Sequence, residues 1–269
     1  MPTLRYVKTP EQIERARSSN PEFTDSTVRS VRCVYRTDLA IARALVPQPL
    51  VVDESAEICV TFSNVAIHIT PEYTFEIGSG IFGVKASYEG VEGIYLVTMP
   101  MTTEQAVVPG RETFGEPKKI AEIAFTREGD SVASSVSRMG MTYLSVEGTV
   151  GAALGSREFT EYGYCVKALP ACDQGRDFDG DPLLVRLEWK HKQTGAWTLD
   201  GTKLTLGESP FDPVADVPVR ELLRAEYEEG STQSNGTVLR SIPGDWFMPF
   251  LQQRYDDMSG EGLEIEAGA

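Results

Sequence analysis

The stretch ICVTFSNVAIHI, residues 58–69, decides the fold class of this chain. It is rich in β-branched side chains, which favour extended strands over helices. Similar short runs recur from residue 57 to about residue 206, separated by glycine or proline turns. They cover residues 82–88, 94–99, 132–137, 143–150, 162–169 and 183–191. This pattern predicts a mainly antiparallel β-barrel or β-sandwich.

Helical patterns flank the strand-rich region. Residues 9–14 combine a capping threonine, a proline at the first helical position and acids in the first turn, which predicts a short helix. Residues 28–36 alternate like a strand, and residues 38–46 read as a helix that ends at a proline-rich turn. Residues 217–229 and 245–257 return to helical periodicity. We therefore expect a mainly β (α+β) chain with peripheral helices.

Length and composition predict one domain. The chain has 269 residues, of which 41% are hydrophobic, so it can bury a sizeable core. No linker separates two halves, and we expect residues 1–257 to form a single domain. Residues 258–269 are acidic and glycine-rich with little to bury, and this composition predicts a mobile tail.

The charge balance argues against polyanionic partners. A net charge of −15, from 25 basic and 40 acidic side chains, repels nucleic acid and anionic membrane surfaces on average. No run approaches the roughly 18 consecutive apolar residues of a membrane-spanning helix, and no apolar leader follows the N-terminus. We expect a cytoplasmic protein that binds neither nucleic acid nor membrane.

The segment GRETFGEPKK, residues 110–119, carries the most chemical information. It places two adjacent lysines directly after a proline and close to Phe114. In an arbitrary sequence such a pair is usually a solvated basic turn, because lysine is mostly exposed. Here apolar stretches flank the pair at residues 105–109 and 120–125, which predicts partial burial.

Partial burial matters for lysine chemistry because an amine attacks a carbonyl only in its neutral form. A free lysine has a pKa of about 10.4, so about one side chain in two thousand is neutral at pH 7. Burial or a second nearby cation shifts this balance toward the neutral amine. A partly buried lysine pair is therefore a candidate nucleophile.

The same segment resembles the signature around the Schiff-base lysine of the acetoacetate decarboxylase family. Further matches follow in order along the chain, and the resemblance extends over roughly residues 27 to 250. They lie at residues 34–38, 46–50, 87–96 and 216–222. The resemblance implies a closed, cone-like antiparallel β-barrel with peripheral helices, a homo-oligomer, a small-molecule keto acid as substrate and no metal or organic cofactor.

By this resemblance Lys118 is the nucleophile, and Lys119 is the neighbour whose charge favours the neutral form of Lys118. Adjacent residues on a strand point to opposite faces, so adjacency alone does not bring the two ammonium groups together. Desolvation of Lys118 is the other route to activation.

The family's other active-site groups transfer with alternatives. Glu76 matches the principal catalytic glutamate, but a shifted alignment puts Ser79 there. Arg29 matches the substrate-facing arginine, with Arg32 as the alternative. A second family glutamate falls near residues 60–62, where this chain has no acid.

Phe114 and Glu116 are the remaining candidates for substrate contact. Glu116 stands where the family commonly has an aromatic residue. A carboxylate against Lys118 favours the charged amine and opposes its activation.

Three functions follow, in order of preference. The first is decarboxylation of a β-keto acid such as acetoacetate through a Lys118 iminium. The second is an aldolase-dehydratase that joins a pyruvate-like keto acid to an aldehyde through the same lysine. The third is a non-catalytic barrel that binds a keto acid.

A Gly-x-Gly-x-x-Gly match at residues 78–83 leads into a strand, not a helix, so we interpret it as a flexible turn beside the active site.

Overall fold

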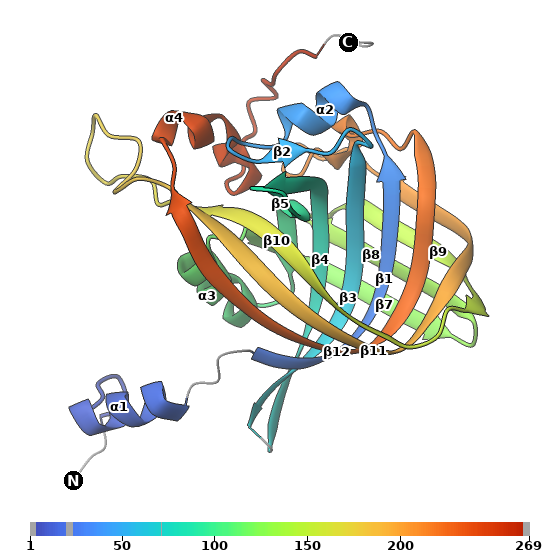
Figure 1. Ribbon diagram of the computed structural model, residues 1–269, viewed down its shortest axis with the longest axis horizontal. Helices are drawn as coiled ribbons and strands as arrows, with labels where there is room; N and C mark the ends of the chain where they lie inside the picture. Colours follow the sequence, from blue (N-terminus) through green and yellow to red (C-terminus); the bar gives the residue numbers. More distant parts are fainter. Residues whose placement is uncertain (1–3, 20–23, 71, 266–269) are drawn as a thin grey trace.

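The computed structural model describes residues 4–19, 24–70 and 72–265, and within them the fold is dominated by one twelve-stranded sheet (Figure 1). The mainly β fold class is confirmed. The strands are β1 (Thr24–Arg36), β2 (Val51–Val52), β3 (Glu57–Thr70), β4 (Tyr73–Tyr88), β5 (Val91–Met101), β6 (Lys118–Ile120), β7 (Glu122–Glu128), β8 (Ser131–Arg138), β9 (Met141–Ala153), β10 (Arg157–Lys167), β11 (Leu183–Leu206) and β12 (Glu221–Ser241). The helices are α1 (Pro10–Ser19), α2 (Leu39–Ala44), α3 (Glu104–Phe114) and α4 (Gly244–Phe247), with 3-10 helices η1 (Val214–Asp216) and η2 (Met248–Gln253).

The sheet closes on itself. Strands β5, β4, β3, β1, β12 and β11 are successive antiparallel neighbours. Strand β10 completes the ring because it pairs with β11 along its whole length and with β5 in a short parallel contact. The second half of β11 leaves the ring to pair with β9, and β8 and β7 extend this branch.

Side chains on the ring strands alternate between two buried faces. On β1, Val31, Cys33 and Tyr35 belong to the main apolar core. The residues between them point the other way, and Ser30 and Arg32 line a cavity on that side. Because side chains alternate along a strand, one extended segment serves both a core and a site.

Strands β3 and β4 follow the same alternation. Phe62, Phe82 and Val84 pack in the main core together with apolar residues of β8 and β9, such as Val136 and Leu144. The branch formed by β7, β8 and β9 therefore covers the face of the ring strands that points away from the cavity.

The glycines at residues 78–83 lie inside β4 and not in a turn, which corrects the interpretation of this motif. A Cβ on Gly78 would lie 2.8 Å from Cβ of Ile123 on β7, and one on Gly80 would lie 2.8 Å from Cγ of Pro100. These glycines allow neighbouring elements to approach β4 closely.

Of the two helices predicted toward the C-terminus, one is a strand and the other is much shorter than predicted. Residues 217–229 contain most of the first half of β12, which pairs with β1 and β11. Leucine, glutamate, arginine and alanine favour helix intrinsically, but hydrogen bonding to strands on both sides overrides this preference. Residues 245–257 contain all but the first residue of the four-residue helix α4, followed by the 3-10 helix η2.

Helix α3 was not predicted as such. Its sequence EQAVVPGRETF contains Pro109 in the interior, a residue that normally ends a helix. The other two predicted helices are present as α1 and α2.

Residues 258–265 contain neither helix nor strand, and residues 266–269 of the predicted tail lie outside the described residues. In the described part of the chain, no helix is both long and apolar enough to span a membrane.

Candidate active site

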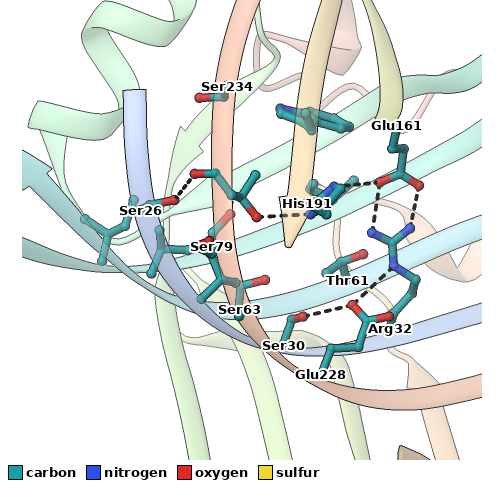
Figure 2. Close-up of a pocket in the computed structure, with 18 of the residues that line it drawn as sticks. Ser26, Ser30, Arg32, Thr61, Ser63, Ser79, Glu161, His191, Glu228 and Ser234 are labelled. Atoms are coloured by element: carbon teal, nitrogen blue, oxygen red, sulfur yellow. Dashed lines mark hydrogen bonds and ion pairs between the residues drawn. The ribbon is translucent and has the colours of Figure 1, made fainter. Parts of the chain in front are cut away.

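The cavity on the inner face of the ring has a volume of about 180 Å³. Its wall comes mainly from β1, β3, β4, β11 and β12, with contributions from β5, β6 and β10 (Figure 2). Lys118 is the one lysine among the described residues that line it. A partly buried amine thus faces a space large enough for a small carbonyl compound.

The chain places Lys118 through a helix end and a short strand. Gly115 caps the C-terminal end of helix α3, and its φ of 77° lies in the left-handed region that glycine favours. Strand β6 then runs parallel to β5, with Lys118 opposite Met99. The Met99 N–H donates to the Pro117 carbonyl at 3.0 Å, and Arg111 Nη1 donates to the Lys118 carbonyl at 2.8 Å. The backbone of the lysine is therefore fixed from two sides.

Glu116 forms an ion pair with Lys118. Its Oε2 lies 2.8 Å from Lys118 Nζ, and the two side chains are 8% and 12% exposed. This contact is the arrangement that the sequence raised, with a carboxylate directly against the lysine amine. It also places a proton acceptor directly on the amine.

Gly110 makes this pair sterically possible. A Cβ at this position on α3 would collide with Oε2 of Glu116 and would lie 2.7 Å from Nζ of Lys118. This explains why the signature segment begins with glycine, because any side chain at residue 110 would enter the space of the ion pair.

Lys119 points to the opposite side of β6. Its Nζ lies 3.2 Å from Asp212 Oδ1 and 3.0 Å from Asp256 Oδ1, and it donates to the Phe211 carbonyl at 3.0 Å. Arg138 pairs with the same two aspartates. This placement corrects the prediction of Lys119 as a catalytic neighbour, because its charge is balanced in a separate buried ionic cluster.

Of the two alternatives on β4, the structure places Ser79 in the cavity and Glu76 outside it. Ser79 and Ile77 line the cavity. Glu76 lies on the other face of the strand, opposite Ala66 of β3, and is exposed. Residues that are an odd number of positions apart on a regular strand point to opposite faces. Glu76 and Ser79 are three positions apart, so they cannot both face the site.

The two arginines of β1 divide in the same way. Arg32 lines the cavity and is 8% exposed. Arg29 is exposed on the opposite face, where its Nη2 lies 3.5 Å from Asn64 Oδ1. In both pairs of candidates, the second alternative is the one that lines the cavity.

Phe114 does not line the cavity. It ends α3 and packs with the smaller apolar cluster beside the site, while its carbonyl accepts a hydrogen bond from Cys165 Sγ at 3.2 Å. Its contribution is to the position of the helix end that precedes Glu116 and Lys118.

The structure adds acidic residues that sequence analysis missed. Glu161 accepts two hydrogen bonds from Arg32, Nη1–Oε1 at 2.5 Å and Nη2–Oε2 at 2.9 Å. Glu228 lies 3.9 Å from Arg32 Nε, and His191 Nε2 lies 3.5 Å from Glu161 (Figure 2). These residues come from β10, β11 and β12, and no spacing in the sequence signals that they meet.

The Arg32–Glu161 pair has a clear electrostatic consequence. Burial opposes ionisation of Glu161, but the Arg32 guanidinium and the His191 ring outweigh it and hold the pKa of this carboxyl below its usual value of 4.5. The guanidinium of Arg32 is thus already balanced by a carboxylate, and a substrate carboxylate there must compete with Glu161.

Solved structures with this architecture define the class of the fold. An acetoacetate decarboxylase from Legionella pneumophila aligns with a TM-score of 0.69 at 16% identity, covering 90% of this chain and 93% of that one. The enduracididine biosynthesis enzyme MppR, in complex with the condensation product of pyruvate and imidazole 4-carboxaldehyde, aligns with a TM-score of 0.70 at 15% identity. That alignment covers 82% of this chain and 90% of MppR. The fold is of the acetoacetate decarboxylase type.

The sequence supports the same assignment. Residues 8–242 match the acetoacetate decarboxylase (ADC) family. The acetoacetate decarboxylase of Clostridium acetobutylicum is 29% identical over 204 residues, which cover 72% of this chain and 79% of that protein. The chain belongs to the acetoacetate decarboxylase family. This membership supports a lyase-type enzyme.

We predict that Gly110→Ala destabilises the fold. Alanine normally stabilises a helix interior by up to about 1 kcal/mol relative to glycine. Here the added methyl meets the Glu116–Lys118 pair, so we expect the free energy of unfolding to fall by about 2 kcal/mol through overpacking. Urea denaturation followed by tryptophan fluorescence measures the change. Gly180→Ala is the control, because a Cβ there meets no atom within 4 Å. A stabilised Gly110→Ala protein would contradict the packing described.

We also predict that Glu161→Gln lowers stability at pH 7 by about 3 kcal/mol, because Arg32 loses its main buried partner. The folded-state pKa of Glu161 is lowered, so its contribution is present above the ordinary value of 4.5 and declines as the pH falls below that value. The difference between wild type and variant should therefore shrink at pH 3.

Urea denaturation at pH 7 and pH 3 makes this comparison. Glu158→Gln, on the same strand, is the matched control because Glu158 is 70% exposed and pairs only with Lys192 among the described residues. A wild-type advantage that is equal at both pH values would contradict the assigned cause.

Proposed function

We propose that this chain is a Schiff-base-forming lyase that acts on a keto acid through Lys118, and that its reaction is decarboxylation of a β-keto acid such as acetoacetate. The observation that carries the proposal is the position of Lys118. Its amine lies at the cavity wall, in the segment that resembles the family's Schiff-base signature, and its side chain is 12% exposed. Water can therefore be largely excluded once a substrate fills the cavity.

The proposed reaction begins when the neutral amine adds to the ketone and water leaves, which gives an iminium. The bond from the α-carbon to the carboxylate then breaks, its electron pair moves toward the iminium nitrogen, and carbon dioxide departs. The enamine takes a proton at carbon. Water finally adds to the iminium, releases the ketone and regenerates the lysine amine.

Glu116 is the group placed to move protons in this sequence. At 2.8 Å from Lys118 Nζ it accepts the proton that the ammonium must lose before attack. The protonated carboxyl returns this proton to the carbinolamine hydroxyl, which leaves as water when the iminium forms. The proton that the enamine takes at carbon comes from solvent, and Glu116 can relay it. In this role Glu116 takes the place that alignment gave to Glu76, which lies outside the cavity.

Specific observations favour a second candidate, the aldolase-dehydratase. MppR, a protein of the same fold, has been solved with a condensation product of pyruvate and an aldehyde. Glu76, which by resemblance matched the principal glutamate of the family's decarboxylases, is absent from the cavity wall. Glu116 supports this reaction equally, because aldol condensation and dehydration both require a proton acceptor near the iminium.

We expect incubation with acetoacetate and borohydride to leave a reduced adduct on Lys118 with release of carbon dioxide, measured by intact mass, peptide mapping and gas evolution. Lys118→Ala should form no adduct, which lowers turnover by at least about a thousandfold because the nucleophile is gone. Lys203→Ala is the control, since Lys203 is 72% exposed and does not line the cavity.

The outcomes separate the candidates. An adduct without carbon dioxide, and faster trapping of pyruvate, would replace the decarboxylase by the aldolase-dehydratase. Trapping of neither acid on Lys118 would reject Schiff-base chemistry with these substrates.

A further inference from the structure

The cavity contains a row of serine hydroxyls that the proposed chemistry does not use. Ser30 on β1 is directly opposite Ser63 on β3, and Ser63 is opposite Ser79 on β4. All three line the same cavity as Lys118 (Figure 2). We call these three residues the hydroxyl row. Opposed side chains on neighbouring strands lie about 5 Å apart, so the row forms a continuous band across the cavity wall.

The hydroxyl row has unused hydrogen-bonding capacity. Ser63 and Ser79 are each 7% exposed, and within the described residues neither hydroxyl has a hydrogen-bond partner. Ser30 Oγ makes one long contact of 3.4 Å with Glu228 Oε2. Ser63 and Ser79 both line the cavity, where a hydroxyl can donate to and accept from a bound group. The row is therefore arranged for groups that enter the cavity.

The charges beside the row indicate which groups these are. Arg32 lies two positions after Ser30 on the same face of β1. Glu161 occupies both of its terminal nitrogens, and Glu228 lies beside its Nε. Among the described residues that line this end of the cavity, no cation is left unpaired for a second carboxylate. Serine hydroxyls donate and accept, which suits neutral hydroxyl groups.

We propose that the substrate is a keto acid whose acyl chain carries hydroxyl groups, and that Ser30, Ser63 and Ser79 bind them. The inference rests on the proposed function, because Lys118 fixes the carbonyl end of the substrate. Ser79 lies on β4, two strands from β6 and its lysine, so a chain that leaves the iminium carbon crosses the hydroxyl row.

The row also selects against unsubstituted acids. An alkyl chain displaces water from the serines without replacing its hydrogen bonds. A site built to bond a substrate hydroxyl rejects an analogue that lacks it, because its own polar groups are left unpaired. Acetoacetate, which ends in a methyl group, is then a poor substrate compared with hydroxylated acids.

The test compares two six-carbon 2-keto acids, 2-keto-3-deoxygluconate and 2-oxohexanoate, by borohydride trapping on Lys118. Unlike 3-keto acids they do not lose carbon dioxide during the assay, so trapping reports recognition of the acyl chain and not decarboxylation. We expect half-maximal trapping of the hydroxylated acid at a concentration at least about tenfold lower, from two or three added hydrogen bonds. Equal trapping, or a preference for 2-oxohexanoate, would overturn the proposal.

A triple variant, Ser30→Ala/Ser63→Ala/Ser79→Ala, should lose this preference and keep or improve trapping of 2-oxohexanoate. Ser137→Ala is the control, because its hydroxyl bonds Thr142 in the β8–β9 hairpin outside the cavity. A triple variant that folds, as judged by its thermal transition, and still prefers the hydroxylated acid would refute the role of the row.

Binding without covalent chemistry separates the two proposals. Calorimetric titration of the wild type with gluconate and with hexanoate needs no Schiff base. Tighter binding of gluconate supports the hydroxyl row even if no keto acid is trapped on Lys118, in which case only the proposed function fails. Indifference between the two acids overturns the assignment of the row.

Discussion

The alternation of side chains between two buried faces of the same strands is the constraint on which the rest of this structure depends. An antiparallel sheet commonly has one face packed against the core and the other exposed to solvent. Here both faces of β1, β3 and β4 are buried. One face holds the apolar core under β7, β8 and β9, and the other holds the cavity. A residue's position along the strand therefore decides whether its side chain enters the main apolar core or lines the cavity.

The same rule separates the two adjacent lysines. Lys118 faces the cavity and Glu116, whereas Lys119 faces Asp212 and Asp256 on the far side of the short strand β6. A cation that is balanced by two carboxylates has little effect on an amine on the opposite face. In the proposed reaction, removal of the proton from Lys118 therefore falls to Glu116, and substrate binding excludes water from the pair.

Sequence analysis predicted the fold class correctly, because it depends on local signals. The segment with Lys118 is also a local signal, and the structure places this lysine at the cavity wall, while its role as nucleophile stays a prediction. Strand-forming runs such as residues 58–69 and the segment at residues 110–119 can be recognised without knowledge of the fold. The prediction of a helix at residues 217–229 was wrong because strand pairing across long sequence distances overrode intrinsic preference. The same limit applies to Glu161 and Glu228, which reach Arg32 from other strands.

Ambiguity between neighbouring candidates had a different origin. Alignment could not choose between Glu76 and Ser79, or between Arg29 and Arg32, since both members of each pair are polar and close in sequence. Apolar residues occur on both faces of these strands, so hydropathy did not mark the inner face. Once the strand register is known, the alternation of side chains shows which member of each pair lines the cavity.

The measurement that tests this account most directly is a crystal structure of the protein after borohydride reduction with a keto acid. We predict electron density continuous from Lys118 Nζ into the cavity between β1, β3 and β4, with Glu116 beside the new bond and Lys119 still paired with Asp212 and Asp256. An adduct on Lys119, or a ligand bound away from this cavity with Lys118 unmodified, would contradict the central claim that strand alternation assigns the chemistry to Lys118.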